Sequence, residues 1–75
     1  MKSYIDMKLQ FIENHINEKP IVTAVYFEKD NKKSGGKYLE YTGNIKRIDM
    51  VSQELKFIDG KIINLNNIYD LEVNL

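Results

Sequence analysis

Apolar positions near the start of the chain recur at helical spacing. Four aliphatic residues follow one another at intervals of four, three and four, namely Ile5, Leu9, Ile12 and Ile16. This stripe predicts an amphipathic helix over residues 3–17. Ser3, with Asp6 three positions later, resembles a capping box at the start of the helix. Pro20 prevents the helix from continuing.

A second apolar group lies about a quarter turn or more around the same helix. It consists of Tyr4, Met7 and Phe11, with His15 at its far end. Two outcomes are open at this point. The helix either packs deeply enough to bury both groups, or leaves the second group exposed as a contact surface for another protein or a second copy. Tyr4, Met7 and Phe11 are therefore a candidate partner interface.

From residue 21 onward, apolar and polar positions alternate with a period of two. Valine, isoleucine, threonine and aromatic residues dominate, which is typical of β-strands. Turn residues divide this part of the chain into five strands, predicted at residues 21–27, 38–50, 54–58, 61–65 and 68–73. The polar segment 29–37 contains two adjacent glycines and is too short for a domain linker, so it predicts a long hairpin loop.

Three short signals predict the local geometry of the strands and turns. The alternation slips in the long second strand, which places a bulge or bend at Gly43 or at the Lys46–Arg47 pair. Asp59-Gly60 between apolar runs predicts a two-residue hairpin turn of type I′. Asn66-Asn67 suits a short turn, or one turn of 3₁₀ helix.

These elements predict a mostly β fold with one N-terminal helix. Five short strands in about 55 residues cannot form a large sandwich, and their connections are short and antiparallel. The compact arrangement is a five-stranded, strongly bent small barrel over residues 20–73, of the Sm-like or SH3-like kind. The helix then covers one open end or face, and residues 1–75 form a single domain.

Composition narrows the class of protein. The chain has 75 residues, no cysteine and one histidine, which excludes disulfides, thiolate metal sites and histidine-rich metal sites. Lysine plus arginine and aspartate plus glutamate number 11 each, so net charge provides no overall attraction to nucleic acid. The residues after Lys2 lack the apolar run of a signal peptide, and no membrane span is present. We expect a cytoplasmic protein.

Residues 41–49 carry a family resemblance. The run Tyr-Thr-Gly-Asn-Ile-Lys-Arg-Ile-Asp resembles the G-x-I-x-x-I-D pattern of YolD-like proteins, which are small proteins of Firmicutes and their phages. Residues 55–57 and 63–68 resemble the closing strands of that family, with Asn67 where an aspartate is usual. The resemblance covers roughly residues 20–71.

The resemblance implies an Sm-like small barrel without enzymatic activity. Genes for YolD-like proteins tend to lie beside a gene for a UmuC-like translesion DNA polymerase. The resemblance therefore implies a role in the DNA-damage response similar to that of UmuD. It supplies no binding residues for this chain.

The sequence shows no recognisable catalytic or cofactor-binding constellation. His15 is the only histidine, and Ser3, Ser34 and Ser52 do not lie in a nucleophile elbow. Ser34-Gly35-Gly36 lacks the strand-to-helix context of a phosphate-binding loop. We expect no enzyme activity, no catalytic residues, no metal and no cofactor.

Basic and aromatic residues gather around the first long loop. The candidate nucleic-acid contacts are Lys32, Lys33, Lys37, Tyr38 and Tyr41. Small barrels bind single strands by stacking bases on aromatic rings beside a basic groove. The alternative is that the lysines only keep a hairpin tip soluble, and Glu28 and Asp30 dilute the positive charge.

Two functional hypotheses follow from these observations. The leading one is a non-catalytic interaction module that binds a protein, such as a DNA polymerase, or another copy of itself in a homo-oligomer. The alternative is an Sm-like protein that binds single-stranded RNA or DNA. A third, weaker hypothesis is a phage or mobile-element regulator with an unrelated partner.

Overall fold

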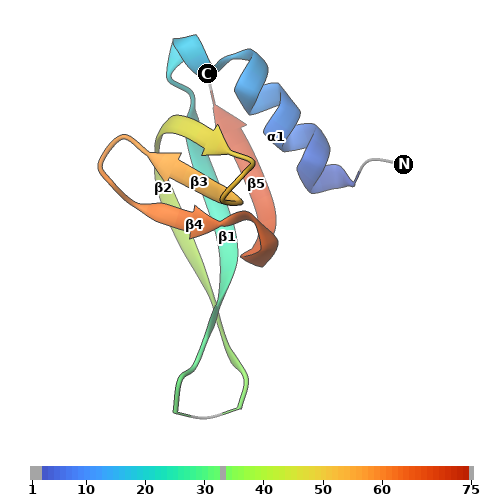
Figure 1. Ribbon diagram of the computed structural model, residues 1–75, viewed down its shortest axis with the longest axis vertical. Coiled ribbons are helices and arrows are strands. Elements are labelled where there is room, and N and C mark those ends of the chain that lie inside the picture. The colour runs from blue at the N-terminus through green and yellow to red at the C-terminus, as the bar shows by residue number, and fades with distance from the viewer. Residues whose placement is uncertain (1–2, 33, 75) are drawn as a thin grey trace.

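The computed structural model describes residues 3–32 and 34–74 (Figure 1). Their order is one α-helix, five strands and two short 3₁₀ helices. The elements are α1 (Tyr4–Asn14), η1 (Ile16–Glu18), β1 (Ile21–Lys29), β2 (Gly36–Asp49), β3 (Glu54–Phe57), β4 (Ile62–Asn64), η2 (Leu65–Asn67) and β5 (Ile68–Asn74). The mostly β fold with an N-terminal helix is confirmed.

Helix α1 starts where the sequence predicts and ends earlier. The Ser3 side-chain oxygen accepts a hydrogen bond of 3.1 Å from the backbone N–H of Asp6, which caps the first turn. The α-helix ends at Asn14, three residues before the predicted end. Beyond it the backbone N–H groups of Glu18 and Lys19 bond three residues back, which tightens the chain into the 3₁₀ helix η1.

The five strands form one bent antiparallel sheet in the order β4-β3-β2-β1-β5. Strand β2 belongs to both halves of this sheet, because residues 36–44 pair with β1 and residues 45–49 pair with β3. In Figure 1, β3 and β4 accordingly cross in front of β1 and β2. The long second strand therefore carries the bend that the alternation of its residues predicts.

The bend in β2 lies at a bulge. The register with β3 slips between Ile45 and Arg47, so Lys46 is the extra residue. This confirms the second of the two predicted positions. Gly43 has a different role: a Cβ atom there would lie 3.0 Å from the Phe57 ring, so glycine is needed for this close approach rather than for the bend.

The sheet is bent but not closed. Within the described residues, β4 pairs with β3 only and β5 pairs with β1 only. The predicted closed barrel is therefore not confirmed. The concave side is filled by ten buried apolar side chains, two of them from α1: Leu9, Ile12, Val22, Ala24, Ile45, Leu55, Phe57, Ile63, Leu65 and Leu71.

The β1–β2 hairpin is longer than predicted. Both strands extend two residues further toward the loop, up to the pair Lys29 and Gly36, so the connection is shorter than the predicted segment 29–37. Figure 1 shows this hairpin projecting beyond the other strands as an arm. Charged residues at the strand ends obscure this extension in the hydrophobic pattern.

The type I′ prediction for the β3–β4 turn is wrong. A type I′ turn needs a positive φ at both central residues. Gly60 has φ 98°, but Asp59 is not among the described residues with positive φ. The N–H of Gly60 donates to the Phe57 carbonyl at 3.1 Å, and the N–H of Phe57 donates to the Lys61 carbonyl at 2.9 Å. This pattern is a three-residue connection closed by a glycine bulge.

Candidate functional site

The second apolar group of α1 is exposed. Tyr4, Met7 and Phe11 keep 58%, 61% and 44% of their surface accessible, while Leu9 and Ile12 on the neighbouring face enter the core. Of the two predicted outcomes, the structure has the one in which the helix leaves this group outside. We call Tyr4, Met7 and Phe11 the α1 face.

The α1 face borders a shallow groove of about 360 Å³. Val73 from β5 and Lys8 complete its lining. The Lys8 ammonium lies 5.2 Å from the centre of the Tyr4 ring, and the rings of Phe11 and His15 are 4.4 Å apart. These contacts hold the aromatic side chains in place beside the groove. The sequence did not predict Val73 as part of this groove. The alternation of residues in the last strand indicates only that the Val73 side chain points inward.

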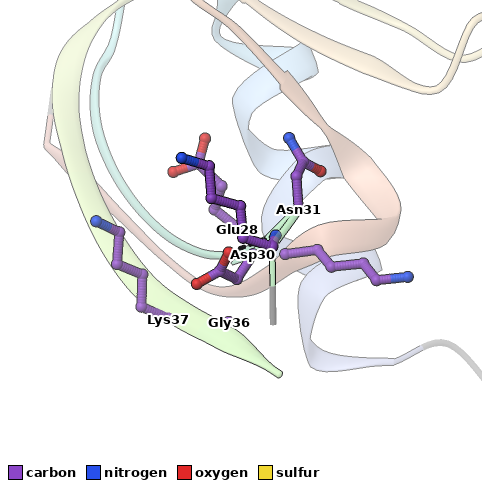
Figure 2. A pocket seen from close by; sticks show the side chains of 7 residues that line it. Glu28, Asp30, Asn31, Gly36 and Lys37 are labelled. Carbon is purple, nitrogen blue, oxygen red and sulfur yellow. Dashed lines mark hydrogen bonds between the residues drawn. The ribbon is translucent and has the colours of Figure 1, made fainter. Parts of the chain in front are cut away.

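The described lysines of the β1–β2 hairpin do not form a continuous basic surface. Lys29, Lys32 and Lys37 line a basin of about 450 Å³ together with Glu28 and Asp30. Asp30 also accepts a hydrogen bond of 2.8 Å from the backbone N–H of Lys32. Figure 2 shows Lys37 extending outward on the side of the basin opposite Asn31. Lys33, another predicted contact, lies outside the described residues.

Tyr38 and Tyr41 lie on opposite faces of β2. Tyr41 pairs with the buried Ala24 and points toward the concave side, where its ring packs at 4.9 Å against Phe57. Tyr38 pairs with Phe27 on the convex side and is 61% exposed. The two tyrosines therefore cannot form one stacking platform for the same strand of nucleic acid.

Tyr41 belongs to a polar cluster beside the β3–β4 turn. Its hydroxyl donates a hydrogen bond to the Asp59 carboxylate. This bond raises the pKa of Tyr41 and, with the backbone N–H of Lys61, lowers the pKa of Asp59. The Lys61 ammonium lies 5.5 Å from the centre of the Tyr41 ring. These contacts tie the turn to the sheet, which is a structural role.

The convex side carries an aromatic cluster that sequence reasoning missed in part. The Tyr38 ring lies 5.4 Å from Phe27 and 5.3 Å from Tyr69, edge to face in both pairs. Tyr69 comes from β5 and is 68% exposed. Only the strand order, which sets β5 beside β1, brings these rings together.

Asp49, the last residue of the YolD-like pattern, stabilises the β2–β3 turn. Its carboxylate accepts hydrogen bonds from the backbone N–H groups of Ser52 at 3.1 Å and Val51 at 3.0 Å. It also pairs with Arg47 at 3.0 Å. The hydrogen bond from Ser52 is the largest cause that lowers the pKa of Asp49.

Comparison with protein-family models, curated proteins and solved structures finds no match to this chain. The YolD-like resemblance therefore stays a prediction. Among residues 3–32 and 34–74, no group of three or more metal-ligating side chains is arranged to hold a metal ion. Nor does any helix in that part of the chain have the length and apolar character to cross a membrane.

Proposed function

We propose that the protein is a non-catalytic interaction module that binds another protein through the α1 face. The observation that carries this proposal is the exposure of Tyr4, Met7 and Phe11 on one side of a helix whose other side is anchored in the core. Aromatic residues and methionine are enriched at protein interfaces. A helix held by Leu9 and Ile12 presents them without further ordering of the backbone.

The size of the α1 face favours a different protein over a second copy. A fully buried aromatic side chain contributes 150–250 Å², so the exposed parts of these three side chains amount to roughly 300 Å². Stable interfaces bury about 800 Å² on each partner. Two α1 faces alone therefore make a poor homodimer, whereas a partner that also contacts the surroundings of the groove can bury enough. Homo-oligomer formation stays a prediction that the solution mass tests.

The partner to test first comes from the resemblance to YolD-like proteins. A UmuC-like translesion polymerase is that candidate, and a role in the DNA-damage response belongs to the same proposal. The proposal drawn from this resemblance also includes a closed Sm-like barrel. The three-residue η2 between β4 and β5 supports closure, because it keeps these two edge strands close in the chain.

Binding of single-stranded nucleic acid is the weaker proposal. Lys29, Lys32 and Lys37 share their basin with Glu28 and Asp30, so two carboxylates offset most of the charge of three lysines. Tyr38 and Tyr41 point to opposite sides of β2. Affinity for nucleic acid comes largely from neutralised phosphates, and this surface offers few unopposed cations.

Photo-crosslinking from the α1 face tests the proposed function. A photoreactive amino acid replaces Met7 in one variant and Glu13, on another side of α1, in a matched control. Cells that encode the protein are irradiated with and without DNA damage, and adducts are identified by mass spectrometry. We expect a discrete adduct with one other protein from position 7, lost when Tyr4 and Phe11 are changed to alanine, and absent from position 13.

The identity of the adduct separates the parts of the proposal. An adduct with a translesion polymerase supports the DNA-damage role, and a single different protein supports the module while refuting the polymerase link. An adduct of two copies of this chain refutes a heterologous partner in favour of self-association. Equal adducts from positions 7 and 13 contradict the α1 face as the binding surface.

A further inference from the structure

The convex side of the sheet presents its side chains in rows across β2, β1 and β5. We call this side the outer face. One row is aromatic: Tyr38 on β2 lies opposite Phe27 on β1, and Tyr69 from β5 contacts Tyr38. Tyr38 and Tyr69 are 61% and 68% exposed, so this cluster is not part of the core.

A bulge in β5 turns Tyr69 onto the outer face. The β1–β5 register slips between Val25 and Tyr26, because Val25 lies opposite Asp70 while Tyr26 lies opposite Ile68. Tyr69 is the extra residue of this bulge. Bulges of this kind change the direction of a side chain, and here Tyr69 joins Tyr38 instead of following the regular alternation.

The neighbouring rows carry carboxylates. Val25 lies between Glu40 on β2 and Asp70 on β5, one row from the aromatic cluster. In the next row Thr23 lies opposite Glu72. Successive rows on one face are about 7 Å apart, so Glu40 and Asp70 lie in the row next to the aromatic rings and Glu72 lies about 14 Å from them along the strands.

Within residues 3–32 and 34–74, no lysine or arginine lies over the rings of this cluster. The lysines that lie over aromatic rings in the described residues, Lys8 and Lys61, are on the helix and beside the β3–β4 turn. Lys29, opposite Gly36, is the basic residue that continues the outer face toward the hairpin loop. Across these rows, the three carboxylates outnumber this single lysine.

We infer that the outer face binds an extended, arginine- or lysine-rich segment of a protein. Cationic side chains stack on exposed tyrosine rings through cation–π attraction, and the adjoining carboxylates complete the charge complementarity. The same carboxylates repel phosphates, which disfavours nucleic acid as the occupant. This surface is separate from the α1 face, so the inference does not depend on the proposed function.

The rings and the carboxylates have separable contributions. Tyr38→Phe keeps the ring and its cation–π attraction, whereas Tyr38→Ala removes both. Glu40→Gln and Glu72→Gln keep the shape of the outer face and remove charge. Glu13→Gln on α1 removes the same charge at a distance from the outer face and is the matched control. All four positions are exposed, so these five variants leave the core unchanged.

Fluorescence anisotropy with defined probes tests the inference. The probes are a labelled nine-residue peptide of alternating arginine and serine, the same peptide with glutamate in place of arginine, and a ten-nucleotide oligothymidine. The full chain is titrated at low and at moderate salt. We expect salt-sensitive binding of the arginine peptide, about threefold to thirtyfold weaker in Tyr38→Ala and in the Glu40→Gln/Glu72→Gln pair, and unchanged in Tyr38→Phe and Glu13→Gln.

Three results overturn the inference. One is that the arginine peptide binds no more tightly than the glutamate peptide at low salt. Another is peptide binding that Tyr38→Ala leaves unchanged, which makes the interaction a general charge effect. The third is tighter binding of oligothymidine than of the arginine peptide, strengthened further by Glu40→Gln, which assigns the outer face to nucleic acid.

Discussion

Replacing Gly43 by valine tests how the sheet packs over β3. A Cβ atom at this position would lie 3.0 Å from a carbon of the Phe57 ring and 3.4 Å from a carbon of the Tyr41 ring. Phe57 is 1% exposed and belongs to the buried core cluster. Valine adds two further carbons beyond that Cβ atom, so the variant overpacks the centre of the core.

Two opposing effects set the expected loss of stability. Overpacking a close-packed core costs roughly 1–3 kcal/mol. Valine is a better strand residue than glycine by up to about 1 kcal/mol. At mid-range values of both effects the net loss is about 1–2 kcal/mol, out of a total of roughly 4–11 kcal/mol for a domain of this size. Each kcal/mol lowers the melting temperature of a small domain by roughly 4–8 °C.

Thermal and urea unfolding of four proteins measure this effect and its cause. They are the wild-type protein, Gly43→Val, Phe57→Leu and the double variant. Because the proposed clash is with the Phe57 ring, we expect Gly43→Val to cost less when leucine replaces that ring. An unchanged melting temperature for Gly43→Val refutes the reasoning. If the stability losses of Gly43→Val and Phe57→Leu simply add in the double variant, the strain lies elsewhere in β2.

Two further predictions concern the dependence of stability on pH. The pKa of Asp49 is lowered in the folded chain, so its contribution is present above the unfolded value of about 3.8 and is lost as the pH falls through the folded value. Urea titrations should show that acid lowers the free energy of unfolding less in Asp49→Asn than in the wild-type protein. An equal decrease in the two proteins argues against the turn-capping role. The pKa of Tyr41 is raised above 10.0, so the stability from its bond to Asp59 is present below pH 10 and is lost as the pH rises through the folded value. Tyr41→Phe should be less stable at neutral pH and approach the unchanged protein at high pH, and a constant difference contradicts this.

The elements of the fold follow from local patterns in the sequence. The 3.6-residue stripe of α1, the Ser3 cap and the bulge near Lys46 are all visible in neighbouring residues, because each depends on contacts within a few positions. The length of the β1–β2 hairpin is different. The charged residues 28, 29 and 37 and the glycine at 36 extend the ladder through backbone pairing, which hydrophobic alternation does not record.

The β3–β4 turn shows a second limit of local patterns. Asp59-Gly60 favours a tight turn, and a glycine with positive φ is present. The position of that glycine in the turn depends on the register between β3 and β4. This register is set by burial of Leu55 and Ile63 on one face, which pair directly. Tertiary packing therefore chooses the turn type.

The candidate surfaces could be predicted only in part. The α1 face is visible in the sequence because all three residues lie on one helix. The outer face is not, since Tyr69 reaches Tyr38 through strand order and a bulge. The placement of Tyr38 and Tyr41 on opposite faces of the strand can be predicted from the sequence, because positions three apart on a strand point to opposite faces.

The residues that carry the YolD-like resemblance have structural roles in this chain. Gly43 makes room for Phe57, Ile45 is 1% exposed in the core, and Asp49 caps a turn. These residues therefore serve the packing of the sheet and the turn after β2. The surfaces proposed to bind partners lie elsewhere, on α1 and on the outer face.

The central claim is that the α1 face serves binding and its neighbouring face serves folding. Phe11→Ala and Ile12→Ala test it side by side, because these adjacent residues are 44% and 0% exposed. The measurements are the free energy of unfolding and the yield of the crosslinked adduct from position 7. We expect Ile12→Ala to lose about 2–5 kcal/mol. Phe11→Ala should stay folded, lose about 1 kcal/mol and lose the adduct. Equal destabilisation by both variants, or a folded Phe11→Ala protein that keeps the adduct, contradicts the claim.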